Sequence, residues 1–151
     1  MDLFGRTFLP AAIDAGLTMP AVLRHLDPVR RYLGGNDAVL LVSRCTRPRR
    51  WWSGGYLLAL SRHRLVVLRR GPLRRAPRLH LEAAIPDLHD VRWAPEPGES
   101  RVLLAATAAG VRQKLLVRAR SARAVWQLDA ALGYVFHSAD EAAAPVRPVP
   151  R

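Results

Sequence analysis

An alternation of apolar and polar residues with a period of two recurs in short segments across residues 38–119, and it constrains the fold more than any other feature. A period of two indicates β-strands, because successive side chains of a strand point to opposite faces. Short segments at roughly ten-residue spacing, separated by turn-forming residues, are typical of an antiparallel sandwich or barrel. We expect seven strands, at 38–45, 54–61, 64–70, 78–85, 89–94, 101–108 and 111–119. Ala109-Gly110 predicts a tight hairpin turn between the last two.

Helical patterns precede the strands. Residues 10–16 predict a first short helix, and Thr18 with Pro20 predicts the cap and first turn of a second helix, which ends at Gly34-Gly35. An apolar stripe along this second helix is suited to packing on a sheet. The stripe consists of Leu23, Leu26, Val29, Tyr32 and Leu33.

A third helix follows the strands. Ser121 is a suitable N-cap, and an apolar stripe with helical spacing continues to about Phe136. The stripe consists of Val125, Leu128, Leu132 and Val135. The segment after it is rich in alanine and proline, which predicts disorder. We therefore expect an N-terminal helical segment over 1–36, a mainly β domain over 37–137 and a disordered tail over 138–151.

Two stretches of the β region resemble a known family. Residues 56–67, Tyr-Leu-Leu-Ala-Leu-Ser-Arg-His-Arg-Leu-Val-Val, resemble the second-to-third-strand hairpin of bacterial pleckstrin-homology-like (PH-like) and GRAM-like domains. Residues 85–91, Ile-Pro-Asp-Leu-His-Asp-Val, resemble a stretch that often follows this hairpin. The resemblance covers about 38–136. It implies a PH-like, seven-stranded antiparallel barrel or sandwich that is capped by the C-terminal helix, and a binding module or adaptor in place of an enzyme.

The charge of the chain is unevenly distributed. The net charge is +12, and 23 of the 24 basic residues are arginine. The arginine excess has two interpretations: a GC-rich coding sequence, or anion recognition by guanidinium groups. The scarcity of acids is a separate matter, and it favours a polyanionic partner. Residues 38–81 contain eleven arginines and no acid, so we expect one end of the domain to be strongly positive.

The loop at 46–53 holds the densest candidate site, Arg-Pro-Arg-Arg-Trp-Trp. The resemblance implies a role for this loop, because many PH-like domains bind anionic headgroups through basic residues between their first two strands. Its arginines and indoles could dock on anionic lipid. Alternatively, the tryptophans begin the second strand and the arginines are merely solvated. The anion-binding candidates are Arg44, Arg47, Arg49, Arg50, Trp51, Trp52, Arg62 and Arg64.

Three kinds of partner remain open. An anionic membrane surface or an acidic protein fits the basic face directly. Non-specific nucleic-acid binding is an alternative, although the chain has no sequence-reading motif. A protein–protein module that forms a homodimer is another, because a PH-like barrel has an exposed sheet edge and a groove beside its C-terminal helix.

The remaining features argue against several other classes. A single cysteine, Cys45, excludes an internal disulfide, and its strand-like flanks predict a buried thiol. The five histidines lack the spacing of a metal site, and no catalytic motif or phosphate loop is present, so we expect neither an enzyme nor a cofactor. No stretch suits a membrane span or a secretory signal, which predicts a cytoplasmic protein. A peripheral position at the inner membrane face is compatible with its basic charge.

Overall fold

The alternating segments form seven strands of one antiparallel sheet in the computed structural model, which describes residues 2–48, 55–70 and 76–143. The strands are β1 (Val39–Thr46), β2 (Tyr56–Ser61), β3 (Arg64–Arg69), β4 (Arg78–Ala84), β5 (Leu88–Glu96), β6 (Arg101–Ala108) and β7 (Val111–Arg118). Helices α1 (Leu3–Asp14) and α2 (Met19–Leu33) precede them, and α3 (Ala122–Ala143) follows. Single 3-10 turns, η1 (Ile85–Asp87) and η2 (Pro97–Glu99), flank β5. The predicted hairpin turn is confirmed, since both Ala109 and Gly110 have positive φ.

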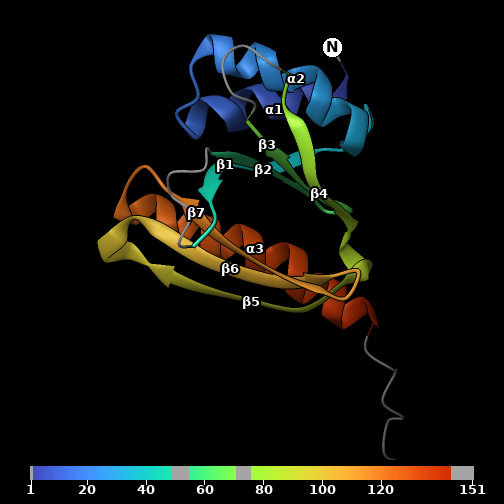
Figure 1. Cartoon of the computed structure of the whole chain (residues 1–151), viewed down its shortest axis with the longest axis vertical. Helices are drawn as coiled ribbons and strands as arrows, with labels where there is room; N and C mark the ends of the chain where they lie inside the picture. Colours follow the sequence, from blue (N-terminus) through green and yellow to red (C-terminus); the bar gives the residue numbers. More distant parts are fainter. Residues whose placement is uncertain (1, 49–54, 71–75, 144–151) are drawn as a thin grey trace, which may run out of the picture.

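The sheet consists of two halves that meet at β1 and β7. The strand order is β4-β3-β2-β1-β7-β6-β5. β1 pairs with β2 along its length but with β7 only at Cys45 and Thr46. In Figure 1 the two halves, β1–β4 and β5–β7, lie in separate layers, and α3 runs along β5 and β6.

The first core lies between the two half-sheets and α3. It contains inward-facing residues of all seven strands and the predicted stripe of α3, which is confirmed. Phe136 closes the stripe and lies 6.0 Å from Trp93 of β5, centroid to centroid. The indole nitrogen of Trp93 donates a hydrogen bond to Asp129, which fixes α3 on the sheet. The helix thus covers the apolar inner face of β5–β7.

The second core lies on the opposite face of β1–β3, beneath α1 and α2. Phe4 and Phe8 are fully buried there and stack 5.2 Å apart. Because β2 has the first core on one face and helices α1 and α2 on the other, all six of its residues are buried. This two-sided burial explains why β2 is a continuous apolar run without alternation.

Two helix boundaries differ from the sequence prediction. α1 begins at Leu3, seven residues before the predicted start, because Asp2 caps it by accepting a hydrogen bond from the Gly5 amide. Pro10 lies inside the helix and does not start it. α3 continues to Ala143, so the predicted disorder of residues 138–143 is wrong; alanines, the strongest helix formers, dominate this stretch. Residues 144–151 lie outside the described part of the chain.

The predicted stripe of α2 is also partly wrong. Leu23 is 63% exposed, whereas Val29 and Leu33 are buried as expected. His25 lies in the buried face, where only 1% of it is exposed. The Nδ1 atom of His25 donates to the Ala21 carbonyl at 2.8 Å, and Nε2 has no partner among the described residues. Burial lowers the pKa of His25 below its ordinary value of 6.5.

The second core supplies a direct test of the role of α1. Phe8→Ala should lower the free energy of unfolding by about 3–5 kcal/mol, because it removes a fully buried ring and leaves a cavity in the second core. Ile13→Ala, on the exposed side of the same helix, should change it by less than about 0.5 kcal/mol. Urea denaturation measures both. Equal effects would mean that α1 does not pack on the sheet as described.

His25 predicts acid-sensitive folding. The unfolded chain takes up a proton at His25 near pH 6.5, whereas the folded chain resists it, so stability should fall as pH drops below 6.5. His25→Leu should flatten this part of the stability-against-pH curve, as measured by urea denaturation from pH 7.5 to 5. A curve of unchanged slope in the variant would contradict the prediction.

Candidate functional site

Strand pairing brings together residues that are far apart in the sequence. Cys45 pairs with Tyr56, Tyr56 with Arg69, and Arg69 with Arg78, so one row crosses the half-sheet from β1 to β4. One end of the half-sheet therefore contains the end of β1, the start of β2, the end of β3 and the start of β4. Six arginines lie at this end or beside it, and we call them the arginine end. They are Arg24, Arg44, Arg47, Arg69, Arg70 and Arg78.

Three of these arginines surround the buried His25 on the helix side of the sheet. The positive charges of Arg70, Arg24 and Arg44 add to the effect of burial and lower the pKa of His25 further. The hydrogen bond to Ala21 opposes these effects. Arg70 also joins the two neighbouring strands, because its amide donates to the Gly55 carbonyl at 3.0 Å. The helix side of the arginine end thus concentrates positive charge around the imidazole of His25.

His80 marks the inner part of the arginine end, on the barrel side. Its ring lies 4.8 Å from that of Tyr56, and its Nε2 atom has no partner among the described residues. Burial lowers the pKa of His80, and the charges of Arg47 and Arg69 lower it further, while Gln113 of β7 acts in the opposite direction. The neutral imidazole of His80 therefore lies close to the cationic side chains of Arg47 and Arg69.

The sequence of residues 78–85 predicts a strict alternation with His80 on the face opposite to Leu79 and Leu81, and the structure corrects this prediction. The register shifts where Val67 pairs with Leu81 and Leu68 with Leu79, which is a bulge at His80. Leu81 packs on the first core, whereas Leu79 is 41% exposed, so these two residues do not share a face as predicted. The bulge thus allows His80 to approach Tyr56.

Arg69 and Arg78 form an unfavourable cross-strand pair. Directly paired residues of antiparallel strands share a face, and like charges in this arrangement repel. Across residues 2–48, 55–70 and 76–137, no ion pair to an acid involves any of the six arginines. A bound anion would relieve this repulsion.

The structure divides the predicted site residues into three groups. Arg44 and Arg47 lie at the arginine end. Arg49, Arg50, Trp51 and Trp52 lie outside the described residues.

The third group, Arg62 and Arg64, lies in the β2–β3 hairpin at the opposite end of these strands. Arg64 pairs with Glu82 at 2.6 Å, and Arg62 lies over the ring of Tyr134 in α3, 5.7 Å from its centroid. The fold therefore does not bring these two arginines to the arginine end.

Three further observations bear on chemistry. Burial raises the pKa of the Cys45 thiol to about 12, so the buried thiol stays protonated near neutral pH. Within the described ranges, no helix has the length and apolar character needed to cross a membrane, and no group of three or more His, Cys, Asp or Glu side chains could hold a metal ion.

Comparison with known proteins supports the fold. No protein-family model and no curated protein sequence matches the chain. Among solved structures, it is similar to the crystal structure of the DH/PH domains of a point mutant of p115-RhoGEF, with a TM-score of 0.50 and 9% sequence identity. The match covers 96% of this chain but only 41% of the other. At this identity the similarity concerns the fold alone. Together with the seven-stranded antiparallel sheet, the C-terminal helix and the two N-terminal helices, it shows a PH-like fold.

Proposed function

We propose that this protein is a non-enzymatic PH-like binding module whose arginine end engages an anionic membrane surface. The observation that carries the proposal is the clustering of Arg24, Arg44, Arg47, Arg69, Arg70 and Arg78 without acidic partners among the described residues. Arginine suits this role, because its guanidinium group stays charged and binds phosphate oxygens in pairs. On this proposal the protein is cytoplasmic and visits the inner face of the membrane.

The size of the cluster decides whether charge alone suffices. A cation near an anionic leaflet contributes about 1 kcal/mol. Six arginines would contribute about 6 kcal/mol, which corresponds to a dissociation constant of tens of micromolar. Such binding is reversible and sensitive to salt.

Exposed apolar side chains on α2 favour a membrane over an acidic protein. Met19 and Leu23 are 55% and 63% exposed and lie one helical turn apart, and Leu23 directly precedes Arg24. Apolar side chains beside cations are typical of helices that lie in a membrane interface. Arg49, Arg50, Trp51 and Trp52 remain proposed contributors, because they belong to the loop between β1 and β2, both of which have an end here.

Vesicle binding tests the membrane role. Arg69→Gln combined with Arg78→Gln should weaken binding to phosphatidylserine-containing vesicles about 30-fold, since two contributions of about 1 kcal/mol are lost. Arg62→Gln combined with Arg92→Gln removes the same net charge away from this end and should leave binding nearly unchanged. Co-sedimentation at 0.1 M and 0.5 M salt measures both. Equal losses in the two double variants, or stronger binding to arbitrary duplex DNA than to vesicles, would overturn the proposal.

The repulsion between Arg69 and Arg78 predicts that binding and stability change in opposite directions. Arg78→Gln should weaken vesicle binding yet raise the free energy of unfolding by about 0.5 kcal/mol, because it removes a like-charge pair. The gain should shrink in 0.5 M salt, which screens the repulsion. Urea denaturation at two salt concentrations measures it. A less stable variant would show that Arg78 has a structural role.

A further inference from the structure

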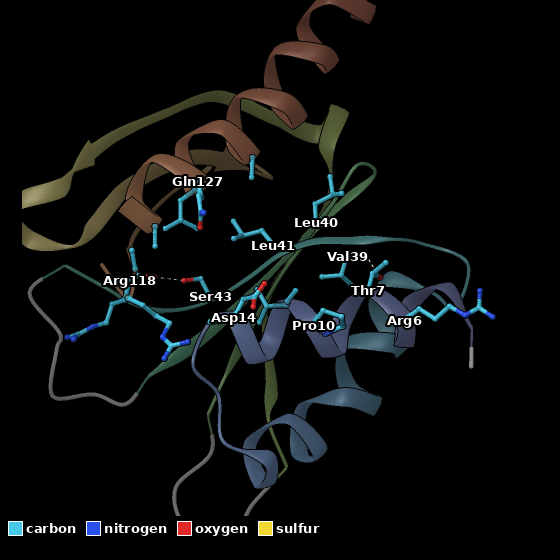
Figure 2. A pocket seen from close by; sticks show the side chains of 18 residues that line it. Arg6, Thr7, Pro10, Asp14, Val39, Leu40, Leu41, Ser43, Arg118 and Gln127 are labelled. Carbon is cyan, nitrogen blue, oxygen red and sulfur yellow. Dashed lines mark hydrogen bonds between the residues drawn. The ribbon is translucent and has the colours of Figure 1, made fainter. Parts of the chain in front are cut away.

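A groove lies between α1, β1 and the start of α3, away from the paired arginines of the sheet. It has a volume of about 450 Å³. Figure 2 shows β1 passing between α3 on one side and α1 on the other, with Leu41 and Gln127 on the α3 side and Pro10 and Asp14 on the α1 side. We call this cavity the β1 groove.

The residues that line the groove show that it follows a strand edge. Five consecutive residues of β1, from Val39 to Ser43, contribute to the lining. Consecutive side chains of a strand point to opposite faces. Leu41 packs on the barrel core and Val42 on the core beneath the helices. A cavity that contacts both residues must therefore run along the edge of β1.

This edge has no strand partner among the described residues. β7 pairs with β1 only at Cys45 and Thr46, which leaves the first part of the strand uncovered. The Val39 amide donates to Thr7 Oγ1 at 2.8 Å, and Ser43 Oγ donates to the Arg118 carbonyl at 2.5 Å, so both ends of the edge are tied to neighbouring elements. Between them, no hydrogen bond from α1, α3 or β7 reaches the main chain of residues 40–42 in the described structure.

The walls of the groove leave room for a chain. Small side chains face it from α1, from the end of β7 and from α3, where larger ones would close it. They are Ala11, Ala15, Ala119, Ala124 and Ala131. The uncovered edge of five residues is about 16 Å long at 3.3 Å per residue. It fits a short extended segment.

The charges of the residues that line the groove indicate which charges a bound extended segment would carry. Arg118 and Arg120 lie at the end of β7, and Arg6 lies at the opposite end of the groove, as Figure 2 shows for Arg6 and Arg118. Asp14 is the single acid that lines the groove within the described residues. Cations at both ends favour an extended chain that carries carboxylates at its two ends.

We infer that the β1 groove captures an extended acidic segment of a partner protein, which adds as a strand to the free edge of β1. Main-chain hydrogen bonds to those of residues 40–42 whose N–H and C=O groups point away from β2 would provide affinity, and the arginines at the two ends would provide selectivity. A second copy of this chain is a poor occupant. Its own β1 edge lies between its own helices, and it would place arginine against arginine. This site is separate from the arginine end and does not depend on the proposed membrane role.

A peptide with alternating side chains tests the inference. The probe is a fluorescein-labelled heptapeptide, Glu-Val-Thr-Val-Thr-Val-Glu, with blocked ends, and its binding to the full chain is followed by fluorescence anisotropy. We expect saturable binding below about 1 mM and slowed amide hydrogen exchange in residues 40–42. A peptide with N-methylated central residues has the same charge but lacks the donors, and it should bind at least tenfold more weakly.

Paired variants separate the groove from the rest of α3. Ala124→Trp fills the groove and should weaken peptide binding at least tenfold, whereas Ala130→Trp, on the exposed side of the same helix, should not. Arg118→Gln with Arg120→Gln should weaken binding about tenfold, and Arg123→Gln with Arg92→Gln serves as the charge-matched control.

Several outcomes would overturn the inference. They are absence of binding at 1 mM, equal affinity of the N-methylated peptide, equal effects of the two tryptophan variants, and a concentration-dependent dimer that Ala124→Trp abolishes. Vesicle binding by Ala124→Trp should remain as in the unmodified chain, so failure of this site is distinguishable from failure of the membrane proposal.

Discussion

β1 pairs with β2 along its length but with β7 over only two residues, and this short pairing joins the two half-sheets into one barrel. The brevity of the contact has two consequences. It allows the half-sheets to diverge, so that the apolar interior can be filled by α3. It also leaves the first part of β1 without a strand on one side, where α1 and α3 form the walls of the β1 groove. The same strand ends at the arginine end. Both candidate surfaces therefore depend on where β1 changes partners.

Much of the fold could be predicted from local patterns. Short apolar or alternating segments between turn residues located all seven strands to within about two residues, and Ser121 and the stripe of α3 located the last helix. These features depend on near neighbours in the sequence, for which periodicity is informative. The errors arose where tertiary contacts decide. α1 extends over Pro10 because its buried phenylalanines pack on β1–β3, and the bulge at His80 depends on the neighbouring strand.

The candidate site was only partly predictable, because it depends on which strand ends the antiparallel hairpins bring together. The acid-free stretch from 38 to 81 led us to expect a concentration of positive charge at one end of the domain. Sequence proximity alone then grouped Arg62 and Arg64 with Arg44 and Arg47, although an antiparallel hairpin places its turn at the far end. Counting along the hairpins would have selected Arg69 and Arg78 instead. The groove gave no sequence signal, since it results from the absence of pairing along one edge of β1.

Cys45 adds a practical consequence of this architecture. The thiol is 1% exposed and lies in the short stretch where β1 contacts both neighbouring strands. An alkylating reagent attacks the thiolate, and the Cys45 thiolate is both inaccessible and unfavourable in the folded chain. Modification therefore requires the structure around Cys45 to open first. The rate at which the single cysteine of the chain is alkylated therefore reports how often the structure around the β1–β7 contact opens, and no label elsewhere is needed.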